Sequence, residues 1–206
     1  MATVVSTLFI SLDGVVEIDP AWHFPYFDDN MGAAVAEDYA GANALLIGRV
    51  TYDSFAGAWP GREDAGGPDA TFAVQLGDVR KIVASRQDLD LGWRNAELLQ
   101  GELPEAVAAL RSDPSIQKIL IPGSISIVRQ LLEVELLDEL RLLVHPVAAR
   151  HGERLFTEAD SPLPLRLLRS ESFPTGVLRL IYGIGEPLAA TTYEDVVDDL
   201  PGAGDS

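Results

Sequence analysis

The sequence contains no cysteine, which excludes disulfide bonds and thiolate chemistry. It also lacks an apolar run of membrane-spanning length, and its N-terminus has no basic region followed by an apolar signal segment. These absences predict a cytoplasmic protein. Basic residues are scarce, because 15 Lys and Arg stand against 32 Asp and Glu, for a formal net charge of −17. Such a charge repels nucleic acid and anionic membranes, and an anionic cofactor would need a local concentration of Arg and helix N-termini.

The stretch at residues 118–132 carries the clearest combination of signals. Residues 119–121 form a short apolar run typical of a strand covered on both faces, and a Pro-Gly pair ends it. Apolar residues then recur at helical spacing from Ile125 onward. A helix that starts beside Gly123 and Ser124 presents unpaired backbone N–H groups and the positive end of its dipole to a phosphate. The alternative is an ordinary strand-to-helix turn in which Ser124 caps the helix.

Two earlier strands are expected to end in similar chemistry. Residues 44–47 form a buried apolar run, and Gly48 begins a turn from this strand into a helix. Residues 80–86 predict a third strand, which ends in a hydroxyl and a guanidinium. These two groups, Ser85 and Arg86, are side chains able to grip a phosphate monoester. Three strands of the predicted fold therefore end in groups suited to an anion.

Aromatic residues are concentrated at 22–27, after the first strand. They predict either a flap packed on the core or a stacking surface for a flat ligand. Asp28, Asp29 and Asn30 can cap the helix that follows, which should end near Gly41. The other expected elements are strands at 3–10, 96–99 and 138–147, helices at 103–110 and, in short or irregular form, 70–76, an exposed loop at 57–68, and an antiparallel hairpin of 163–173 and 177–184.

Several short motifs occur in a recognisable order along the chain. They are Ser11-Leu12-Asp13-Gly14, Gly48-Arg49-x-Thr51-Tyr52-x-Ser54, Ala84-Ser85-Arg86, Gly123-Ser124, Leu136-Leu137-Asp138-Glu139-Leu140, His145-Pro146-Val147 and Gly152-Glu153-Arg154-Leu155-Phe156.

These motifs resemble the dihydrofolate reductase-like superfamily, and most closely the family of the reductase (C-terminal) domain of the bacterial riboflavin biosynthesis protein RibD. The resemblance implies an α/β domain at residues 1–185 with a dihydrofolate reductase-like fold. In that fold, helices flank a central mixed, mostly parallel sheet, and an antiparallel hairpin forms the C-terminal end. Residues 186–206 are an acidic tail, expected either to fray or to form a short helix at 192–200.

The resemblance implies that the protein binds NADPH. Two departures from the family pattern bear on the site: Pro-Gly-Ser at 122–124 replaces a Gly-Gly pair, and residues 148–152 replace a Leu-Gly-x-Gly turn on the substrate side. The residues that the resemblance assigns to the cofactor are Gly48, Arg49, Val50 and Thr51 along the adenosine side and the phosphates, Ser85 and Arg86 at the 2′-phosphate, and Gly123, Ser124 and Ile125 at the pyrophosphate and the nicotinamide end.

Reduction of a C=N or C=O bond also needs a proton, which a shielded carboxyl with a raised pKa could supply. Asp28 and Asp29 occupy the position at which the pterin reductases place their acid, and Asp13 is the other candidate. The alternatives are a helix cap for the Asp pair and a turn former for Asp13. His23 and His145 are expected to be packed or solvated. The His residues show no ligand spacing, so no metal site is predicted.

The resulting hypothesis is an NADPH-dependent reductase of a small heterocycle of the pterin, folate or pyrimidine type. The alternative is a dinucleotide- or pterin-binding module without turnover, because the sequence indicates a cofactor site more clearly than a catalytic acid. A homodimer is expected, since the late strands carry more apolar side chains than one layer of helices covers. These side chains are Leu140, Leu142, Val144, Leu165, Leu167, Leu178, Leu180 and Tyr182.

Overall fold

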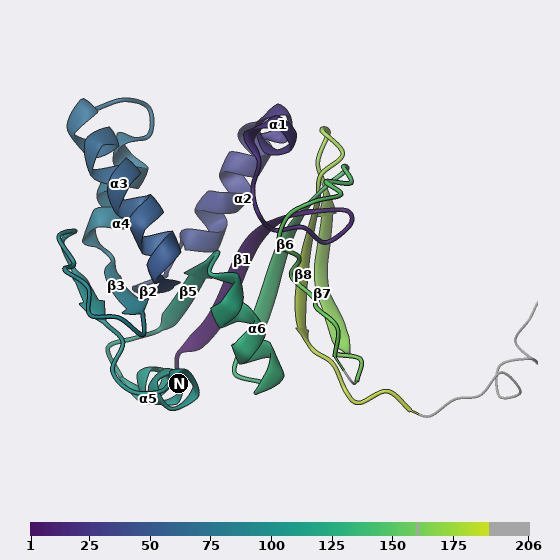
Figure 1. The fold of residues 1–206 in the computed structure, drawn as a ribbon. Helices are drawn as coiled ribbons and strands as arrows, with labels where there is room; N and C mark the ends of the chain where they lie inside the picture. The colour runs from purple at the N-terminus through teal and green to yellow at the C-terminus, as the bar shows by residue number, and fades with distance from the viewer. Residues whose placement is uncertain (160, 190–206) are drawn as a thin grey trace, which may run out of the picture.

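Eight strands form one sheet in the order β4-β3-β2-β5-β1-β6-β8-β7 (Figure 1). The computed structural model describes residues 1–159 and 161–189. The strands are β1 (Thr3–Ser11), β2 (Ala44–Gly48), β3 (Arg80–Ala84), β4 (Ala96–Leu98), β5 (Lys118–Pro122), β6 (Glu139–His145), β7 (Leu165–Ser172) and β8 (Leu178–Ile184). The helices are α1 (Pro20–His23), the 3-10 helix η1 (Phe24–Tyr26), α2 (Asp29–Tyr39), α3 (Arg49–Ala65), α4 (Ala70–Asp78), α5 (Leu103–Ser112) and α6 (Ile125–Glu133).

The strands from β4 to β6 are parallel, whereas β8 runs antiparallel to β6 and β7 runs antiparallel to β8. This architecture confirms the expected α/β fold with its closing hairpin. In the described part of the chain, no helix combines the length and the apolar character needed to cross a membrane. The helix expected at 192–200 lies outside the described residues.

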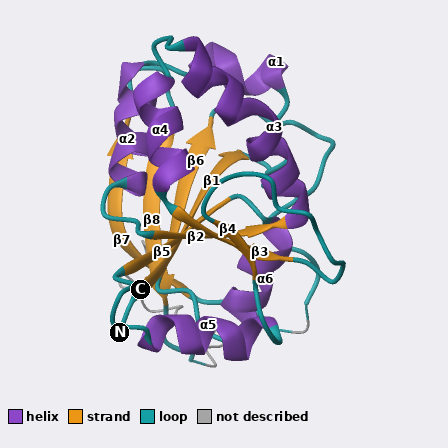
Figure 2. Cartoon of the chain, turned by 90° about the vertical axis from the view of Figure 1, so that its left-hand side faces the viewer, coloured by secondary structure: helices purple, strands orange, loops and turns teal. Residues whose placement is uncertain are grey.

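The central strands β2 and β5 are largely apolar because helices cover both faces of the sheet (Figure 2). Leu45 and Ile47 of β2 pack in the same cluster as residues of α3 and α4. Leu46, which points the other way, packs in a second cluster with residues of α5 and α6. Burial on both sides explains why the runs at β2 and β5 lack the alternation of a strand with one exposed face.

The order of the strands changes direction between β2 and β5: from β2 the chain continues to β3 on one side of the sheet, and from β5 it continues to β6 on the other side. Strands β2 and β5 are neighbours, with Ala44 paired to Ile119. The chain leaves β2 through α3 on one face of the sheet and leaves β5 through α6 on the other face. Open α/β sheets bind ligands at such a switch point, in the crevice outside the carboxyl ends of the strands.

The loop expected at 57–68 is wrong, because α3 continues to residue 65 through Gly57, Pro60 and Gly61. Tertiary contacts hold this segment in a helix despite its weak propensity. The ring of Trp59 lies 5.2 Å from that of Phe72 on α4, and Glu63 accepts a hydrogen bond from Arg94 at 2.7 Å. The helix ends at Gly66, which adopts a left-handed conformation with φ 64°.

A buried ion network fixes the end of α2 to the sheet. Asp38 is 1% exposed and accepts hydrogen bonds from Arg179 at 2.5 Å, from Arg141 at 2.9 Å and from the Thr7 hydroxyl at 2.7 Å. Arg179 is 2% exposed and also pairs with Glu37 at 2.5 Å. Because β1, β6 and β8 all contribute to this network, it sets the position of α2 over the sheet.

Candidate functional site

The side chain of Ser124 connects the two turns at the switch point. Its Oγ accepts the backbone N–H of Gly48 at 2.8 Å and donates to Thr51 Oγ1, also at 2.8 Å. Ser124 occupies the N-cap position of α6, but its side chain makes no hydrogen bond to that helix. Ser124 is therefore the N-cap residue, as the alternative expected, but its side chain does not cap the helix. Gly123 and Ser124 both have positive φ, 97° and 58°, whereas a capping serine usually has an extended backbone.

Two helix N-termini meet at this point without side-chain caps. Helix α3 begins directly after Gly48, and α6 begins directly after Ser124, and neither receives a side-chain cap hydrogen bond. The first N–H groups of a helix have no partner within it, and they carry the positive end of the helix dipole. The adjacent ends of β2 and β5 therefore present two positive helix ends to one location.

The two turns lie close together. A Cβ atom added to Gly48 would lie 3.6 Å from Ser124 Oγ, and one added to Gly123 would lie 3.7 Å from Thr51 Oγ1. These are ordinary van der Waals distances, so a side chain larger than a methyl group at either position would contact the other turn. The N–H donors and the hydroxyls around the two turns are groups of the kind that bind phosphate in proteins.

Arg86 adds a positive charge to the same edge of the sheet. It follows β3, whose last residue, Ala84, is paired with Gly48. All 15 Lys and Arg side chains lie in the described part of the chain, and twelve of them donate to a carboxylate or to a backbone carbonyl. Arg86, Arg150 and Arg166 make no such bond to a described residue, so within the described chain Arg86 keeps an available guanidinium.

The other residues expected to contact the cofactor make local contacts. Ser85 Oγ accepts the N–H of Gln87 at 3.0 Å and donates to its carbonyl at 2.9 Å, which bends the chain after β3. Arg49 pairs with Asp53 at 3.0 Å on the exposed face of α3. Val50 is exposed in the first turn of that helix. The structure thus brings the three predicted motifs to adjacent strand ends.

The three candidate acids lie in different surroundings. Asp13 accepts the N–H groups of Ala149 and Arg150, each at 2.9 Å, and the Ser11 hydroxyl at 2.6 Å. The hydrogen bond from Ser11 is the largest cause of the lowering of the Asp13 pKa, well below its usual range, and those from the two N–H groups add to it. A carboxylate held in its ionised form is a poor proton donor. Asp13 therefore fixes the turn after β1 to residues 149–150.

Asp28 caps α2 by accepting the N–H of Met31 at 2.9 Å. Its hydrogen bond from the Asn30 side chain, followed by that from Met31, lowers the pKa of Asp28. Asp29 lies exposed in the first turn of the same helix. The capping interpretation of Asp28 is therefore confirmed, and neither Asp13 nor Asp28 has the raised pKa of a general acid.

A pair of buried histidines, which the sequence did not predict, lies at the carboxyl ends of β1 and β6. Nδ1 of His23 lies 3.1 Å from Nε2 of His145, and Nδ1 of His145 lies 3.0 Å from the carbonyl oxygen of Leu143. Burial lowers the pKa of both rings, that of His23 to about 4, and the neighbouring His145 contributes to the shift at His23. The rings of Phe9 and Trp22 pack against the pair. Both histidines are therefore neutral at pH 7.

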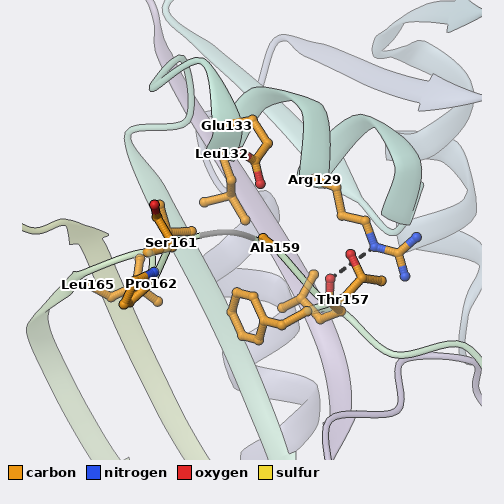
Figure 3. A pocket seen from close by; sticks show the side chains of 11 residues that line it. Arg129, Leu132, Glu133, Thr157, Ala159, Ser161, Pro162 and Leu165 are labelled. Atoms are coloured by element: carbon orange, nitrogen blue, oxygen red, sulfur yellow. Dashed lines mark hydrogen bonds between the residues drawn. The ribbon is translucent and has the colours of Figure 1, made fainter.

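A cavity of about 500 Å³ lies away from the switch point (Figure 3). Arg129, Leu132 and Glu133 of α6 line one side. The other side is lined by Leu155, Phe156, Thr157, Ala159, Ser161, Pro162, Leu163 and Leu165. Arg129 crosses between the two sides, since its Nε donates to the carbonyl of Leu155 at 3.0 Å. This cavity borders the start of β7, and it does not touch the ends of β2, β3 and β5.

Comparisons with known proteins agree with this geometry. Residues 2–179 match the family model of the RibD C-terminal domain. The Bacillus subtilis protein YyaP, described as uncharacterized, is 24% identical over 191 residues, which cover 87% of this chain and 93% of that protein.

Two crystal structures share the fold. One is a putative riboflavin biosynthesis protein from a Shewanella species, with a TM-score of 0.67 and 21% identity over 90% of this chain and 100% of that one. The other is a pyrimidine reductase-like protein from Corynebacterium diphtheriae, with a TM-score of 0.61 and 16% identity over 90% of this chain and 93% of that one.

Proposed function

The chain belongs to the RibD C-terminal domain family, and we propose that it is an NADPH-dependent reductase of a small heterocyclic substrate. The structural neighbours that carry reductase and riboflavin-biosynthesis names support a reductase-type function. The substrate is expected to be of the pterin, folate or pyrimidine type.

One observation carries the proposal. The hydrogen bond from the Gly48 N–H to Ser124 Oγ joins two uncapped helix N-termini at the switch point of the sheet. A serine at the N-cap position commonly accepts an N–H group of its own helix. Neither the packing of the core nor the turn between β5 and α6 requires Ser124 to do otherwise. An anion that accepts the free N–H groups of both helices explains the arrangement, and a dinucleotide pyrophosphate has the charge and the oxygen atoms to do so.

The remaining residues have separate tasks in this proposal. Gly123, Ser124 and Ile125 would hold the pyrophosphate at the start of α6, and residues 48–51 would hold it at the start of α3. Arg86 would pair with the 2′-phosphate that distinguishes NADPH from NADH. When bound, the nicotinamide supplies the hydride. The protein orients the donor and the substrate along the carboxyl edge of the sheet and limits the access of water.

A second candidate function is a binding module without turnover. The carboxylate pKa values favour it, because Asp13 and Asp28 are both stabilised in their ionised forms. An enzyme with this site would take the proton from water or from the substrate's own acidic group. The second function and the first therefore share the cofactor site and differ only in turnover.

The test has two stages. Titration of the protein with NADPH, followed by the change in nicotinamide fluorescence, measures cofactor binding. Loss of absorbance at 340 nm in the presence of a panel of pterins, folates and pyrimidines then measures turnover. Binding with turnover supports the reductase, and binding without turnover across the panel supports the module. Failure to bind NADPH excludes the reductase and a dinucleotide-binding module, and leaves only a module that binds a pterin.

We also propose that the protein forms a homodimer through β7 and β8. Leu167 is 51% exposed and Leu178 is 41% exposed, and Leu180 and Tyr182 are only half-buried beside them. Exposed apolar side chains in one area are typical of an interface. Leu140 and Leu142 of β6, which the sequence also suggested for this surface, are buried in the core instead.

A further inference from the structure

The aromatic residues before α2 form one cluster around His23. The ring of His23 lies 4.3 Å from that of Phe9, 5.4 Å from that of Phe24 and 5.6 Å from that of Phe27. Two of these rings remain open to solvent, since Phe24 is 63% exposed and Phe27 is 47% exposed. An exposed pair of rings fixed on a buried cluster offers a rigid apolar surface to a flat ligand.

The cluster lies on the correct edge of the sheet for a substrate. It sits at the carboxyl ends of β1 and β6, because Phe9 belongs to β1 and His23 contacts His145 at the end of β6. Strand β1 is paired with β5, which leads to Gly123. Neighbouring strands are about 5 Å apart and a strand rises about 3.3 Å per residue, and Phe9 lies two residues beyond Thr7, the partner of Pro122. Phe9 therefore lies roughly 10 Å from the proposed pyrophosphate site, and His145, two residues further along, lies farther away. A nicotinamide ring can reach over such a distance.

The hydrogen bonds of the histidine pair fix the tautomer of His23. A carbonyl oxygen only accepts, so Nδ1 of His145 carries the proton that points to Leu143, and Nε2 of His145 must accept. Nδ1 of His23 therefore donates to His145. In the neutral ring, which the lowered pKa of His23 favours at pH 7, Nε2 of His23 is left as a hydrogen-bond acceptor.

That acceptor reaches solvent over a small area. In the described chain, the buried side-chain nitrogen and oxygen atoms without a partner are Ser6 Oγ, Trp93 Nε1, Thr175 Oγ1 and Arg179 Nε. Nε2 of His23 is not among them, and no hydrogen bond within the described residues engages it. It therefore belongs to the 4% of the His23 surface that stays exposed. The aromatic surface thus carries one fixed acceptor.

We propose that Phe24, Phe27 and the Nε2 atom of His23 form the substrate-binding surface, and that they select a planar nitrogen heterocycle with a ring N–H donor. The rings of the two phenylalanines stack on the heterocycle, and Nε2 accepts its N–H. His145 is a positioning residue, because it holds His23 in the tautomer that accepts. This inference rests on the proposed reductase function, which supplies the reason for a heterocycle to bind beside the cofactor.

Lumazine and 1,3-dimethyllumazine provide matched probes, because both are flat pteridines and only lumazine has ring N–H donors. Fluorescence titration should show that the wild-type protein binds lumazine at least tenfold more tightly than the dimethyl compound. His23→Phe keeps an aromatic ring but removes the acceptor, and it should reduce this ratio to near one. Phe24→Ala and Phe27→Ala should each weaken both ligands about fivefold or more, since stacking on an aromatic side chain contributes substantially to binding.

Phe156→Ala is the control, because Phe156 is 48% exposed at a site away from the cluster, and it should change neither affinity. Equal affinity of the wild-type protein for the two probes would overturn the proposal. Absence of lumazine binding at millimolar concentration, or equal effects of Phe156→Ala and Phe27→Ala, would overturn it as well.

Each protein is also titrated with NADPH alone. If the wild-type protein does not bind NADPH, the proposed cofactor site is refuted. If it binds NADPH but does not prefer lumazine to the dimethyl compound, the proposed substrate-binding surface is refuted.

Discussion

The backbone N–H of Gly48 donates to the side chain of Ser124 at 2.8 Å, although the two residues are 76 positions apart. This bond connects the start of α3 to the start of α6. Neither helix has a side-chain cap, because Gly48 has no side chain and the Ser124 hydroxyl contacts Gly48 and Thr51 instead of its own helix. The arrangement has measurable consequences for stability and for cofactor binding.

Ser124 should respond differently to alanine and to glycine. Both substitutions remove the bonds to Gly48 and Thr51, and loss of the partner of a part-buried N–H costs about 1–3 kcal/mol of unfolding free energy. Alanine must also adopt the left-handed conformation that Ser124 has, φ 58°, whereas glycine adopts it freely. We therefore expect Ser124→Gly to be about 1 kcal/mol more stable than Ser124→Ala in urea unfolding. Equal stabilities would contradict the role of the backbone conformation.

Asp38 should be the most sensitive carboxylate of the described chain. Asp38→Asn removes the charge that pairs with both Arg179 and Arg141, and it leaves the buried guanidinium of Arg179 with Glu37 alone. Loss of one member of a buried ion pair costs about 3–5 kcal/mol, and we expect the lower end of this range because Glu37 remains. Asp53→Asn is the matched control, because its pair with Arg49 is exposed and contributes at most about 0.5 kcal/mol. Denaturant unfolding of the two variants measures the difference, and similar losses would show that the Asp38 network adds little.

The histidine pair predicts a stability that depends on pH. The pKa of His23 is lowered from 6.5 to about 4 in the folded protein, so between these values the unfolded chain binds the proton and the folded protein does not. Stability should therefore be unaffected by His23 above pH 6.5 and should fall as the pH drops towards 4, by up to about 3 kcal/mol.

Urea unfolding between pH 7 and pH 4 tests this window. Other groups titrate in the same range, so the comparison is between proteins. His23→Phe should lose less stability over the window than the wild-type protein, and a control substitution of the exposed His151, His151→Ala, should lose as much as the wild type. A wild-type and a His23→Phe protein with parallel pH profiles would exclude His23 as the source.

The dimer proposal separates interface residues from core residues. Light scattering should give twice the monomer mass of 22.2 kDa for the wild-type protein. Leu178→Asp, at an exposed position, should give a folded monomer, whereas Leu142→Asp should unfold the protein, because Leu142 is only 6% exposed. A wild-type mass near that of the monomer would exclude the dimer.

Sequence patterns were sufficient where a local signal and the tertiary structure agree. The apolar runs of β2 and β5, and the Asp28 cap, follow from the residues themselves. The sequence pattern failed around Pro60. The density of Gly and Pro there indicated a loop, but the segment is helical, and Trp59 packs against α4. Local propensity is a weak guide where long-range contacts decide the conformation.

The sequence predicted which strands lead to the candidate site, but not how its residues are connected. Glycines, hydroxyls and a guanidinium at strand ends indicated anion binding, which stays a prediction, and the strands that these groups follow are neighbours in the sheet. The sequence gives no signal for the left-handed backbone of Ser124 or for its bond to Gly48. It also gives none for the contact between His23 and His145, which joins residues 122 positions apart.

The central claim is that the linked starts of α3 and α6 bind NADPH and that Arg86 selects its 2′-phosphate. The most direct test is calorimetric titration of the wild-type protein and of Arg86→Ala with NADPH and with NADH. Arg166→Ala is the control, because Arg166 also has no hydrogen-bonding partner among the described residues but lies on β7, away from the site. The wild-type protein should prefer NADPH, and Arg86→Ala should lose about 1.5–3 kcal/mol of NADPH affinity, more than tenfold, with little change for NADH. Equal weakening of both cofactors by Arg86→Ala, or wild-type protein that binds neither, would contradict the account.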